Sequence, residues 1–333
     1  MRTSTRKRAD RRTEPTKVVT WRQGVHLVGS ALWCDALRAQ ELCFVSSALA
    51  LPKTRKRAGT LLCTQTTLSL LAALGRAPLG AQLVSPLGRP FFWGSLRLEL
   101  FASGDVPGSA SLWVKLPSEE RVIYAGQPSE QESPLVDPLQ LRPAETLVLA
   151  APFAPLLQKQ PTPGELTERL VREQAEAHNE GRPLLVRCSS VTQILTLGPL
   201  LVKRLGDGPG GGTLKLHREL QRVVAFCQTL PHSPHVGTVA ARTGRAGELL
   251  WWPHTLAPPP LPSPAREVVI ADGLGWEDLC RYARGSGAKR VYLTAGYSPE
   301  VAAALAAHRI ACEPLGPPQQ LALFAERLVP ASV

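Results

Sequence analysis

The chain has 333 residues, of which 44% are hydrophobic and 20% are charged, a balance that excludes an intrinsically disordered protein. The formal net charge of +11 favours an acidic partner, with nucleic acid first and an anionic membrane surface second; a basic composition without any such partner is the alternative. No apolar run is long enough to span a membrane and no apolar segment follows the basic start, so we expect neither a membrane protein nor a secretory signal.

The first half of the chain is predicted to consist mainly of short strands and turns. After a disordered basic arm over residues 1–17, apolar alternation broken by Gly24 and Gly29 predicts a hairpin region. The apolar run that starts at Cys43 predicts a buried strand, and residues 60–63 predict another, followed by a helix that ends at Gly75. Further strands are predicted over residues 97–103, 109–116, 121–126 and 145–153.

The second half alternates helices with strands, which predicts an α/β arrangement. A capping box formed by Thr162 and Glu165, with Pro163 at the first helical position, starts a long helix that ends at Gly181. The other predicted helices cover residues 190–206, 216–228, 276–287 and 298–310. The predicted strands cover residues 183–188, 267–273, 290–296 and 311–316. A glycine-rich loop at 206–213 and a proline-rich connector at 253–266 separate them.

The seven cysteines are scattered along the chain and form no CxxC pair. Several of them lie inside apolar, strand-like runs, and no secretory signal precedes them. These features are typical of reduced, buried thiols, and we therefore expect a cytoplasmic protein.

Several short motifs carry little functional signal. GDGPGGGTLK lacks the lysine and the preceding strand that a phosphate-binding loop needs. His232 and His235 lie in a proline-broken segment without a cysteine or carboxylate at zinc-site spacing. Ser46 and Ser47 lack the glycines that surround the serine of a nucleophile elbow.

The basic segment PKTRKRAG is a stronger signal. It places Lys53, Arg55, Lys56 and Arg57 in one loop directly after CFVSSALAL. We expect these side chains to contact phosphate groups of a nucleic acid, with a solvated loop as the alternative. Aromatic residues make up only 5% of the chain, which argues against a stacking platform for single strands.

A set of phrases keeps a recognisable order along the chain. They are LWCDALR, CFVSSALAL, AGTLLCTQTTLSLLAALG, ELFASGDVPGSASLWV, RVIYAGQPS, ADGLGWEDL, VYLTAGYSPEVAAAL and LGPPQQLALF. In this order they resemble the metallo-β-lactamase-fold nucleases of the β-CASP group, and most closely the bacterial ligase-associated DNA exonucleases, which are similar to mRNA 3′-end processing nucleases. LWCDALR resembles the family's first motif, a strand that ends in an aspartate, here Asp35, and CFVSSALAL resembles the strand that leads into a His-x-His-x-Asp-His loop.

The resemblance implies a site in which histidines and carboxylates hold two zinc or manganese ions. At the positions that match those ligands and their acidic neighbours, this chain has Ser47, Leu49, Leu51, Pro52, Asp105, Gln127, Ala150, Gly273 and Ala295. Only Asp35 and Asp272 match the family's residues in type. In the family, the motif that corresponds to Asp35 supports the site more than it binds the metal ions. Since affinity depends on the number and geometry of ligands, we expect no bound metal and no other cofactor. Leu49 and Leu51 fit an apolar repacking of a site that has lost its cations.

The resemblance also implies the architecture. It predicts an α/β fold, a metallo-β-lactamase αββα sandwich with an inserted smaller α/β domain of β-CASP type. Residues 18–155 would form the first part of the sandwich. Residues 156–265 would form the inserted cap with its proline-rich connector, and residues 266–333 would return to the sandwich.

These observations lead to three hypotheses for the function. The first is a catalytically inactive relative of these exonucleases, which binds nucleic acid or acts as a scaffold in DNA repair beside a ligase or an active nuclease. The second is an active metallohydrolase whose ligands have moved to Asp35, Asp105, Asp272 and one of His232, His235 or His254. The third is a protein-interaction module without a role in nucleic-acid binding, whose positive charge only keeps it in solution.

Overall fold

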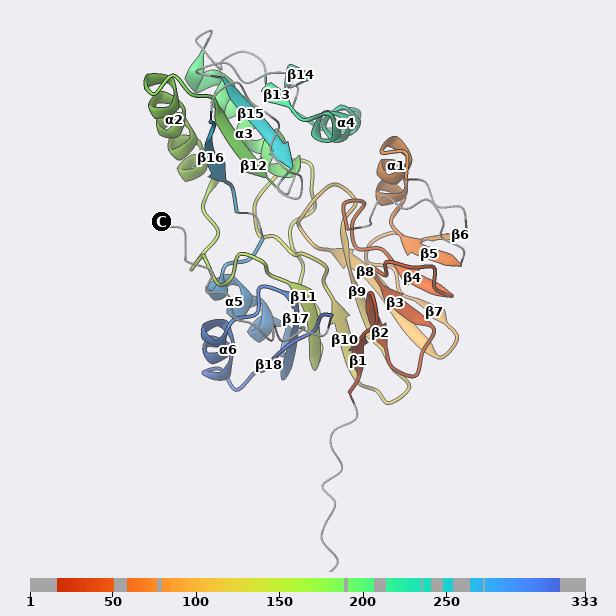
Figure 1. Cartoon of the computed structure of the whole chain (residues 1–333). Coiled ribbons are helices and arrows are strands. Elements are labelled where there is room, and N and C mark those ends of the chain that lie inside the picture. The colour runs from red at the N-terminus through yellow and green to blue at the C-terminus, as the bar shows by residue number, and fades with distance from the viewer. Residues whose placement is uncertain are drawn as a thin grey trace, which may run out of the picture.

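The computed structural model of the chain describes residues 17–50, 59–76, 80–188, 191–206, 214–234, 236–240, 248–253, 264–271 and 273–317. These residues form a mixed α/β protein with three sheets and six helices (Figure 1). Two sheets lie in the lower part of Figure 1, and the third lies above them with three of the helices. The predicted α/β class is therefore confirmed.

The first sheet has six strands that are neighbours in chain order. They are β1 (Val19–Trp21), β2 (Val25–Leu27), β3 (Leu32–Cys34), β4 (Leu42–Phe44), β5 (Thr60–Cys63) and β6 (Ala81–Val84). β1 to β3 are antiparallel, which confirms the predicted hairpin region, and β3 to β6 are parallel. β4 is buried on both faces, because Phe44 packs into the space between the sheets and Cys43 packs on the outer side. Burial on both faces explains the uninterrupted apolar run at this strand.

The second sheet has seven strands. They are β7 (Phe91–Trp93), β8 (Leu96–Ala102), β9 (Ala110–Lys115), β10 (Arg121–Tyr124), β11 (Thr146–Ala150), β17 (Arg290–Ala295) and β18 (Ala311–Pro314). Their spatial order is β18-β17-β11-β10-β9-β8-β7. β7 to β10 are antiparallel, whereas β10, β11, β17 and β18 are parallel to one another. The carboxyl ends of these four strands therefore lie at one edge of the sheet.

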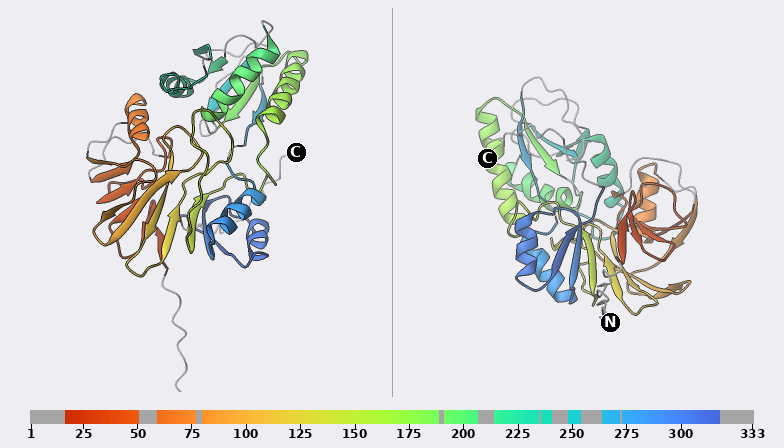
Figure 2. Two further views of the ribbon diagram at one scale, coloured as in Figure 1. Left: turned by 180° about the vertical axis from the view of Figure 1, so that it is seen from behind. Right: turned by 60° about the horizontal axis from the view of Figure 1, so that its bottom comes forward.

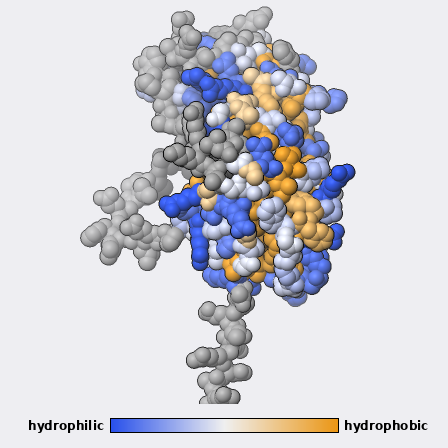
Figure 3. All heavy atoms as spheres, turned by 90° about the vertical axis from the view of Figure 1, so that its right-hand side faces the viewer, coloured by the Kyte–Doolittle hydropathy of each residue, from blue (hydrophilic) through white to orange (hydrophobic). Residues whose placement is uncertain are grey.

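The first two sheets pack face to face and carry helices on their outer sides. Leu27 and Phe44 of the first sheet share a buried cluster with Leu98 and Leu112 of the second. Helix α1 (Gln65–Ala73) packs outside the first sheet, and helices α5 (Trp276–Ser286) and α6 (Pro299–Ala306) pack outside the second. β6 and β7 end their sheets on the right-hand side of Figure 1, and apolar side chains gather on that side of the molecule (Figure 3).

The third sheet has five strands, all parallel, in the order β14-β13-β15-β12-β16. They are β12 (Leu184–Cys188), β13 (Leu214–Leu216), β14 (Thr238–Ala240), β15 (Leu249–Pro253) and β16 (Arg266–Val269). Helices α2 (Pro163–Asn179) and α3 (Val191–Leu205) lie together on one face, which Figure 2 shows from behind, and α4 (Arg218–Cys227) lies beside β13. The chain enters this unit after β11 and leaves it through β16 toward α5.

The predicted caps of α1 and α2 are confirmed. The Thr162 hydroxyl accepts a hydrogen bond from the backbone N–H of Glu165, and the Glu165 carboxylate accepts one from the backbone N–H of Thr162, so the capping box is present. Gly181 follows the helix with a φ of 67°, and Gly75 follows α1 with a φ of 69°. Both glycines adopt the left-handed conformation that commonly ends a helix.

Two predicted boundaries are wrong. The return to the first two sheets was expected at residue 266, but Arg266 opens β16, which pairs with β12 in the third sheet. The guanidinium of Arg266 forms ion pairs with Glu173, Glu176 and Glu180 of α2, and these pairs hold the strand in this unit. The helix predicted from residue 216 starts two residues later, because Leu216 belongs to β13 and pairs with β14 and β15.

All seven cysteines lie in the described residues, and no disulfide links any of them there; six are buried, as expected, and Cys312 is partly buried. Burial raises the pKa of the Cys63 thiol to about 12 and that of the Cys227 thiol likewise to about 12, so both stay protonated at neutral pH. Among the described helices, none combines the length and the apolar content needed to cross a membrane.

An ion pair at the start of β11 is expected to make stability depend on acid pH. The hydrogen bond from the Arg121 side chain lowers the pKa of Glu145 from 4.5 to about 2, although partial burial opposes the shift. Because the folded pKa is lowered, this stabilisation is present above pH 4.5 and is lost as the pH falls from 4.5 toward 2. In urea unfolding, the free energy of unfolding of Glu145→Gln should therefore fall less than that of the wild type between pH 4.5 and 2. Glu119→Gln, at an exposed carboxylate, should fall as the wild type does. Equal pH slopes for Glu145→Gln and the wild-type protein would contradict the assignment.

Candidate functional site

A cavity of about 260 Å³ lies where strands of the first two sheets end. Its lining comes from segments that follow β3, β4, β8 and β10 and from the last residues of β10 and β11. The lining residues are Asp35, Ser46, Ser47, Leu49, Ala50, Asp105, Tyr124, Gly126, Gln127 and Ala150. Loops at the carboxyl ends of parallel strands are the usual place for binding sites in α/β proteins, because neighbouring strands deliver side chains from distant parts of the sequence to one edge.

The cavity brings together many of the positions singled out from the sequence. Ser47, Leu49, Asp105, Gln127 and Ala150, together with Asp35, all line it although they span more than one hundred residues of sequence. The convergence means that these positions share one site, whatever chemistry they retain.

Gly273 lies at the border of this group. A Cβ atom on Gly273 would come within 3.5 Å of Cγ of Gln127. Ala295 pairs in register with Ala150 on the neighbouring strand but does not line the cavity. Leu51, Pro52, Asp272 and the four basic side chains Lys53, Arg55, Lys56 and Arg57 lie outside the described residues, and expectations for them stay predictions.

Asp35 is held by a compact set of hydrogen bonds. Its Oδ1 accepts from the backbone N–H of Ser46 at 2.9 Å, and its Oδ2 accepts from the Ser46 hydroxyl at 2.5 Å and from the Tyr124 hydroxyl at 2.8 Å. The backbone of Asp35 has a φ of 45°, a left-handed conformation that aspartate tolerates better than most residues. The carboxylate thus ties the end of β3 to the ends of β4 and β10.

The donors around Asp35 are buried and stay protonated. Burial raises the pKa of Tyr124 well above its usual value, and the negative charge of Asp35 raises it further. Burial also raises the pKa of Cys34, again with a contribution from Asp35. A neutral phenol that faces a carboxylate acts as a hydrogen-bond donor, so Tyr124 is a partner of Asp35 and not a base. Gly126 permits this packing, because a Cβ there would lie 2.6 Å from the Ser46 hydroxyl oxygen.

The side chains of the cavity do not fit the pair of metal ions that the resemblance implies. Among the described residues, Asp35 and Asp105 are the only carboxylates in the lining, and both oxygens of Asp35 already accept protein hydrogen bonds. Gln127 and Ser47 offer neutral oxygens, which are weak ligands for zinc, and Leu49 and Ala150 offer none.

The proposed relocation of ligands has no support in the described part of the chain. No group of three or more His, Cys, Asp or Glu side chains is placed there to hold a metal ion. His232 is exposed and lies with a φ of 61° in the loop after α4. His235, His254 and Asp272 lie outside the described residues, and their part in a metal site stays a prediction.

A larger cavity of about 610 Å³ opens between the third-sheet unit and the first two sheets. Leu230 and Pro231 line it from the loop after α4, and the start of α1 and the loop at Gly108 line it from the other side. Next to the smaller cavity, the Thr192 hydroxyl of α3 donates a hydrogen bond of 2.6 Å to the backbone carbonyl of Asp105. The boundary between the two parts of the molecule therefore runs along the candidate site.

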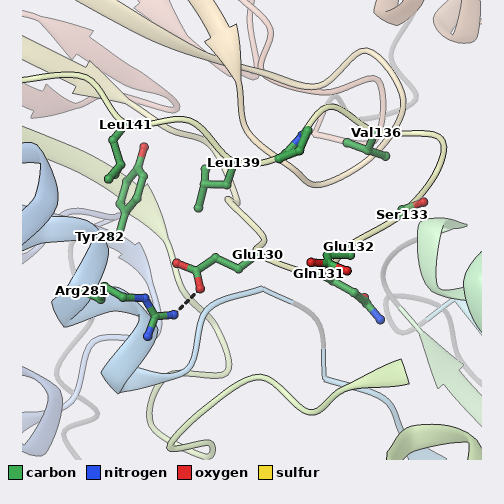
Figure 4. Close-up of a pocket in the computed structure, with 10 residues that line it drawn as sticks. Glu130, Gln131, Glu132, Ser133, Val136, Leu139, Leu141, Arg281 and Tyr282 are labelled. Atoms are coloured by element: carbon green, nitrogen blue, oxygen red, sulfur yellow. Dashed lines mark hydrogen bonds and ion pairs between the residues drawn. The ribbon is translucent and has the colours of Figure 1, made fainter. Parts of the chain in front are cut away.

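The long segment between β10 and β11 links the cavities. Gln127 lines the small cavity, Asp137 lines the large one, and several residues between Glu130 and Leu141 line a third of about 370 Å³ against α5. Figure 4 shows this third cavity, with Arg281 of α5 paired to Glu130 and with Tyr282 standing beside Leu141. Sequence reasoning missed this segment, although its length between two predicted strands was a signal for a functional loop.

The roles of Ser46 and Tyr124 were also missed. Ser46 was considered only as a nucleophile, whereas both of its donor groups serve Asp35. The signal for Tyr124 was its place at the end of a buried strand, where a phenol needs a hydrogen-bond partner.

Comparisons with known proteins do not assign a family to this site. A scan of the sequence against family models found no match, and a search of curated proteins found no significant match.

Proposed function

We propose that this protein is a catalytically inactive relative of metal-dependent nucleases that binds nucleic acid without cleaving it. The proposal includes the finer fold, a metallo-β-lactamase αββα sandwich with an inserted β-CASP-like cap. It also includes a role beside an active nuclease or a ligase in DNA repair.

The topology supports the fold part of the proposal. Two mixed sheets of six and seven strands pack face to face with helices on their outer sides, and a five-stranded parallel sheet is inserted between β11 and α5. The chain leaves the second sheet after β11 and comes back to it at β17. These two strands are neighbours in the sheet, so the inserted unit does not interrupt the strand order β11-β17.

The observation that carries the functional part is the composition of the small cavity. Positions at which the resemblance expects metal ligands converge there, and they hold Ser47, Leu49, Asp105 and Gln127. A two-metal phosphodiesterase needs several anionic or imidazole ligands to lower the pKa of a bound water and to neutralise charge on the phosphate. Among the described residues of the lining, Asp105 supplies one carboxylate, and the other, that of Asp35, already accepts protein hydrogen bonds through both oxygens, so these side chains are better suited to contact a ligand than to activate water.

The charge of the chain supports nucleic acid as the ligand. The formal net charge is +11, and much of it lies in residues 1–22 and in the Lys53–Arg57 segment. Lysine and arginine side chains that neutralise phosphates release counterions, which makes affinity fall steeply with salt. The third hypothesis, a module without a nucleic-acid role, predicts no such salt dependence.

Fluorescence anisotropy with a labelled 20-nucleotide single strand and a matched duplex tests the proposal, in combination with metal analysis and a nuclease assay. We expect binding whose affinity falls about tenfold or more between 50 and 200 mM salt. We expect no stoichiometric zinc or manganese in protein purified without chelator, and no cleavage when manganese is added. The matched variant is Lys53→Gln combined with Arg55→Gln, Lys56→Gln and Arg57→Gln, which should reduce the salt slope.

Two outcomes would overturn the proposal. Stoichiometric metal with turnover that Asp105→Ala abolishes would establish the second hypothesis, an active hydrolase. Absence of binding at 50 mM salt, for both the single strand and the duplex, would leave the interaction module as the surviving hypothesis.

A further inference from the structure

Four side chains, the outer row, lie side by side across one face of the second sheet. Register pairs place them directly opposite one another on adjacent strands: Phe92 on β7, Arg97 on β8, Lys115 on β9 and Arg121 on β10. Because neighbouring strands lie about 4.8 Å apart, the row spans about 14 Å. Residues directly opposite each other point to the same face of a sheet, so the four side chains share one surface.

The outer row points away from the space between the first two sheets. Leu98, Val114 and Val122, each adjacent in sequence to a member of the row, belong to the buried cluster between the sheets. Since successive residues of a strand point to opposite faces, the row lies on the outer face. Helices α5 and α6 cover this face on the side of β11 and β17, and none of the described helices lies over β7 and β8 (Figure 2).

Two aromatic rings accompany the outer row. Phe92 at its end is 73% exposed, more than any other aromatic side chain of the described residues. Trp113 lies on the same face two residues before Lys115, and its ring centre is 6.0 Å from the guanidinium carbon of Arg97. The indole N–H of Trp113 donates a hydrogen bond of 2.9 Å to the carbonyl of Pro143, which fixes the ring. Arg97 therefore has an aromatic ring on each neighbouring strand.

The positive charge of the outer row is compensated only in part. Like charges directly opposite one another destabilise a sheet, and three consecutive strands present a cation here. Arg121 pairs with Glu145. The partner of Lys115 is Glu119, whose side chain is 78% exposed, so their attraction is weak. Among the described residues, no carboxylate forms an ion pair with the exposed Arg97.

The acid closest to the row does not change this balance. Glu99 lies two residues after Arg97 on β8 and so on the same face, but its carboxylate is paired with Arg142 at 2.9 Å. The surface therefore combines an excess of positive charge with exposed rings. Proteins bind single-stranded nucleic acids with this combination, because phosphates contact the cations and unpaired bases stack on the rings.

We propose that the outer row is a contact surface for single-stranded nucleic acid, with phosphate groups at Arg97 and Lys115 and an unpaired base stacked on Phe92. The inference rests on the proposed function and adds a second surface to it. Arg121 starts β10, whereas the small cavity lies beyond the other end of that strand. The position of one exposed ring beside cations, and not the abundance of aromatics, supports the contact, which revises the expectation drawn from the 5% aromatic content.

An anionic membrane would also attract these cations, but the rings fit it less well. Binding to a bilayer surface requires an apolar face that is buried among the headgroups. Phe92 alone protrudes here, because Trp113 is partly buried and hydrogen-bonded.

Fluorescence anisotropy of the whole chain with labelled dT20 and with a 20-base-pair duplex tests the outer row. Phe92→Ala should weaken dT20 binding about tenfold, with the salt slope and the duplex affinity unchanged. Arg97→Gln combined with Lys115→Gln should lower the slope of log affinity against log salt by about 1.4 for dT20, which is about 0.7 for each phosphate contact. Phe92→Trp should retain the affinity for dT20, because it keeps an aromatic face.

Two control variants remove the same kinds of side chain elsewhere. Tyr297→Ala removes a 41% exposed ring that follows β17, at the opposite end of the strands. Arg169→Gln combined with Arg172→Gln removes two exposed cations of α2. Neither control should change the affinity for dT20 or the salt slope as the outer-row variants do. Circular dichroism melting shows that all variants are folded when affinity is compared.

Each contrary result has a distinct meaning. Wild-type affinity for dT20 in Phe92→Ala, or a wild-type salt slope in the double glutamine variant, would overturn the outer row while the proposed function would stand. Equal losses in the control variants, or an equal loss of duplex affinity in Phe92→Ala, would also overturn it. Sedimentation with phosphatidylserine vesicles that Phe92→Ala abolishes, without a loss of dT20 affinity, would make the surface a membrane contact instead. Absence of all nucleic-acid binding by the wild-type protein would overturn the proposed function itself.

Discussion

Asp278→Ala is expected to lower the free energy of unfolding by about 3 kcal/mol, one of the two largest effects we anticipate for a side chain outside the apolar core. Asp278 is only 1% exposed and lies in the first turn of α5. One carboxylate oxygen accepts hydrogen bonds from the backbone N–H groups of Gln160 at 2.8 Å and Gly275 at 3.2 Å, and the other accepts from Arg281 at 2.7 Å.

The expected size of the effect follows from where the partners lie. Gln160 belongs to the segment that enters the third-sheet unit, and Gly275 belongs to the segment that leaves it. Removing the carboxylate would leave two backbone donors without their acceptor, and each buried donor without a partner costs about 1–3 kcal/mol. Arg281 loses less, because its half-exposed guanidinium also pairs with Glu130.

Denaturant unfolding measures this change, and neighbouring substitutions provide the controls. Asp278→Asn retains one carbonyl oxygen as an acceptor and should cost about half as much as the alanine variant. Glu277→Ala, the adjacent residue, removes a single exposed contact with Gln158 and should change stability by less than about 0.5 kcal/mol. If Asp278→Ala cost no more than Glu277→Ala, Asp278 would not be the link between the two connecting segments.

The caps of α1 and α2 and the general α/β class could be predicted, because local chemistry determines them. The reciprocal hydrogen bonds of Thr162 and Glu165, and the left-handed glycines at 75 and 181, depend only on residues within one or two turns. The long amphipathic segment of α2 shows the same independence from distant parts of the chain.

Several short strands could not be predicted, because tertiary pairing stabilises them. β7, β13 and β14 have three residues each, too few for a periodic pattern, and they exist because a neighbouring strand supplies hydrogen-bond partners. β16 was assigned to the wrong sheet for a related reason. Its ion pairs with α2 join residues about ninety positions apart, a distance over which sequence pattern carries no information.

The position of the candidate site followed from the resemblance, but its internal contacts did not. Ordered phrases located Ser47, Asp105 and Gln127 well enough that one cavity contains them. Nothing in the phrases indicated that Ser46 and Tyr124 would bind Asp35, because that contact joins residues 11 and 89 positions apart. A hydrogen-bond network of this kind can be recognised only when the side chains are seen together.

Asp35→Ala is expected to lower the free energy of unfolding by about 3 kcal/mol, with or without added metal. The variant would leave the buried Ser46 and Tyr124 hydroxyls and the Ser46 backbone N–H without their shared acceptor. Alanine would also adopt the left-handed φ of 45° less readily than aspartate, which adds about 1 kcal/mol or less. Asp35→Asn keeps the shape but loses the charge and one acceptor, and should cost about half as much.

The matched variant Asp105→Asn separates a structural acid from a metal ligand. Asp105 lines the same cavity but is only partly buried, so we expect its loss of charge to cost less than about 1 kcal/mol. Unfolding is measured with excess chelator and again with excess manganese for the wild type and both variants. If Asp35 acts only through its hydrogen bonds, the differences in free energy of unfolding among the three proteins are the same with chelator and with manganese. A metal-bound site behaves differently, because a bound ion stabilises the folded state by mass action. Manganese would then stabilise the wild type but not the Asp105 variant, and the cavity would be a metal centre after all.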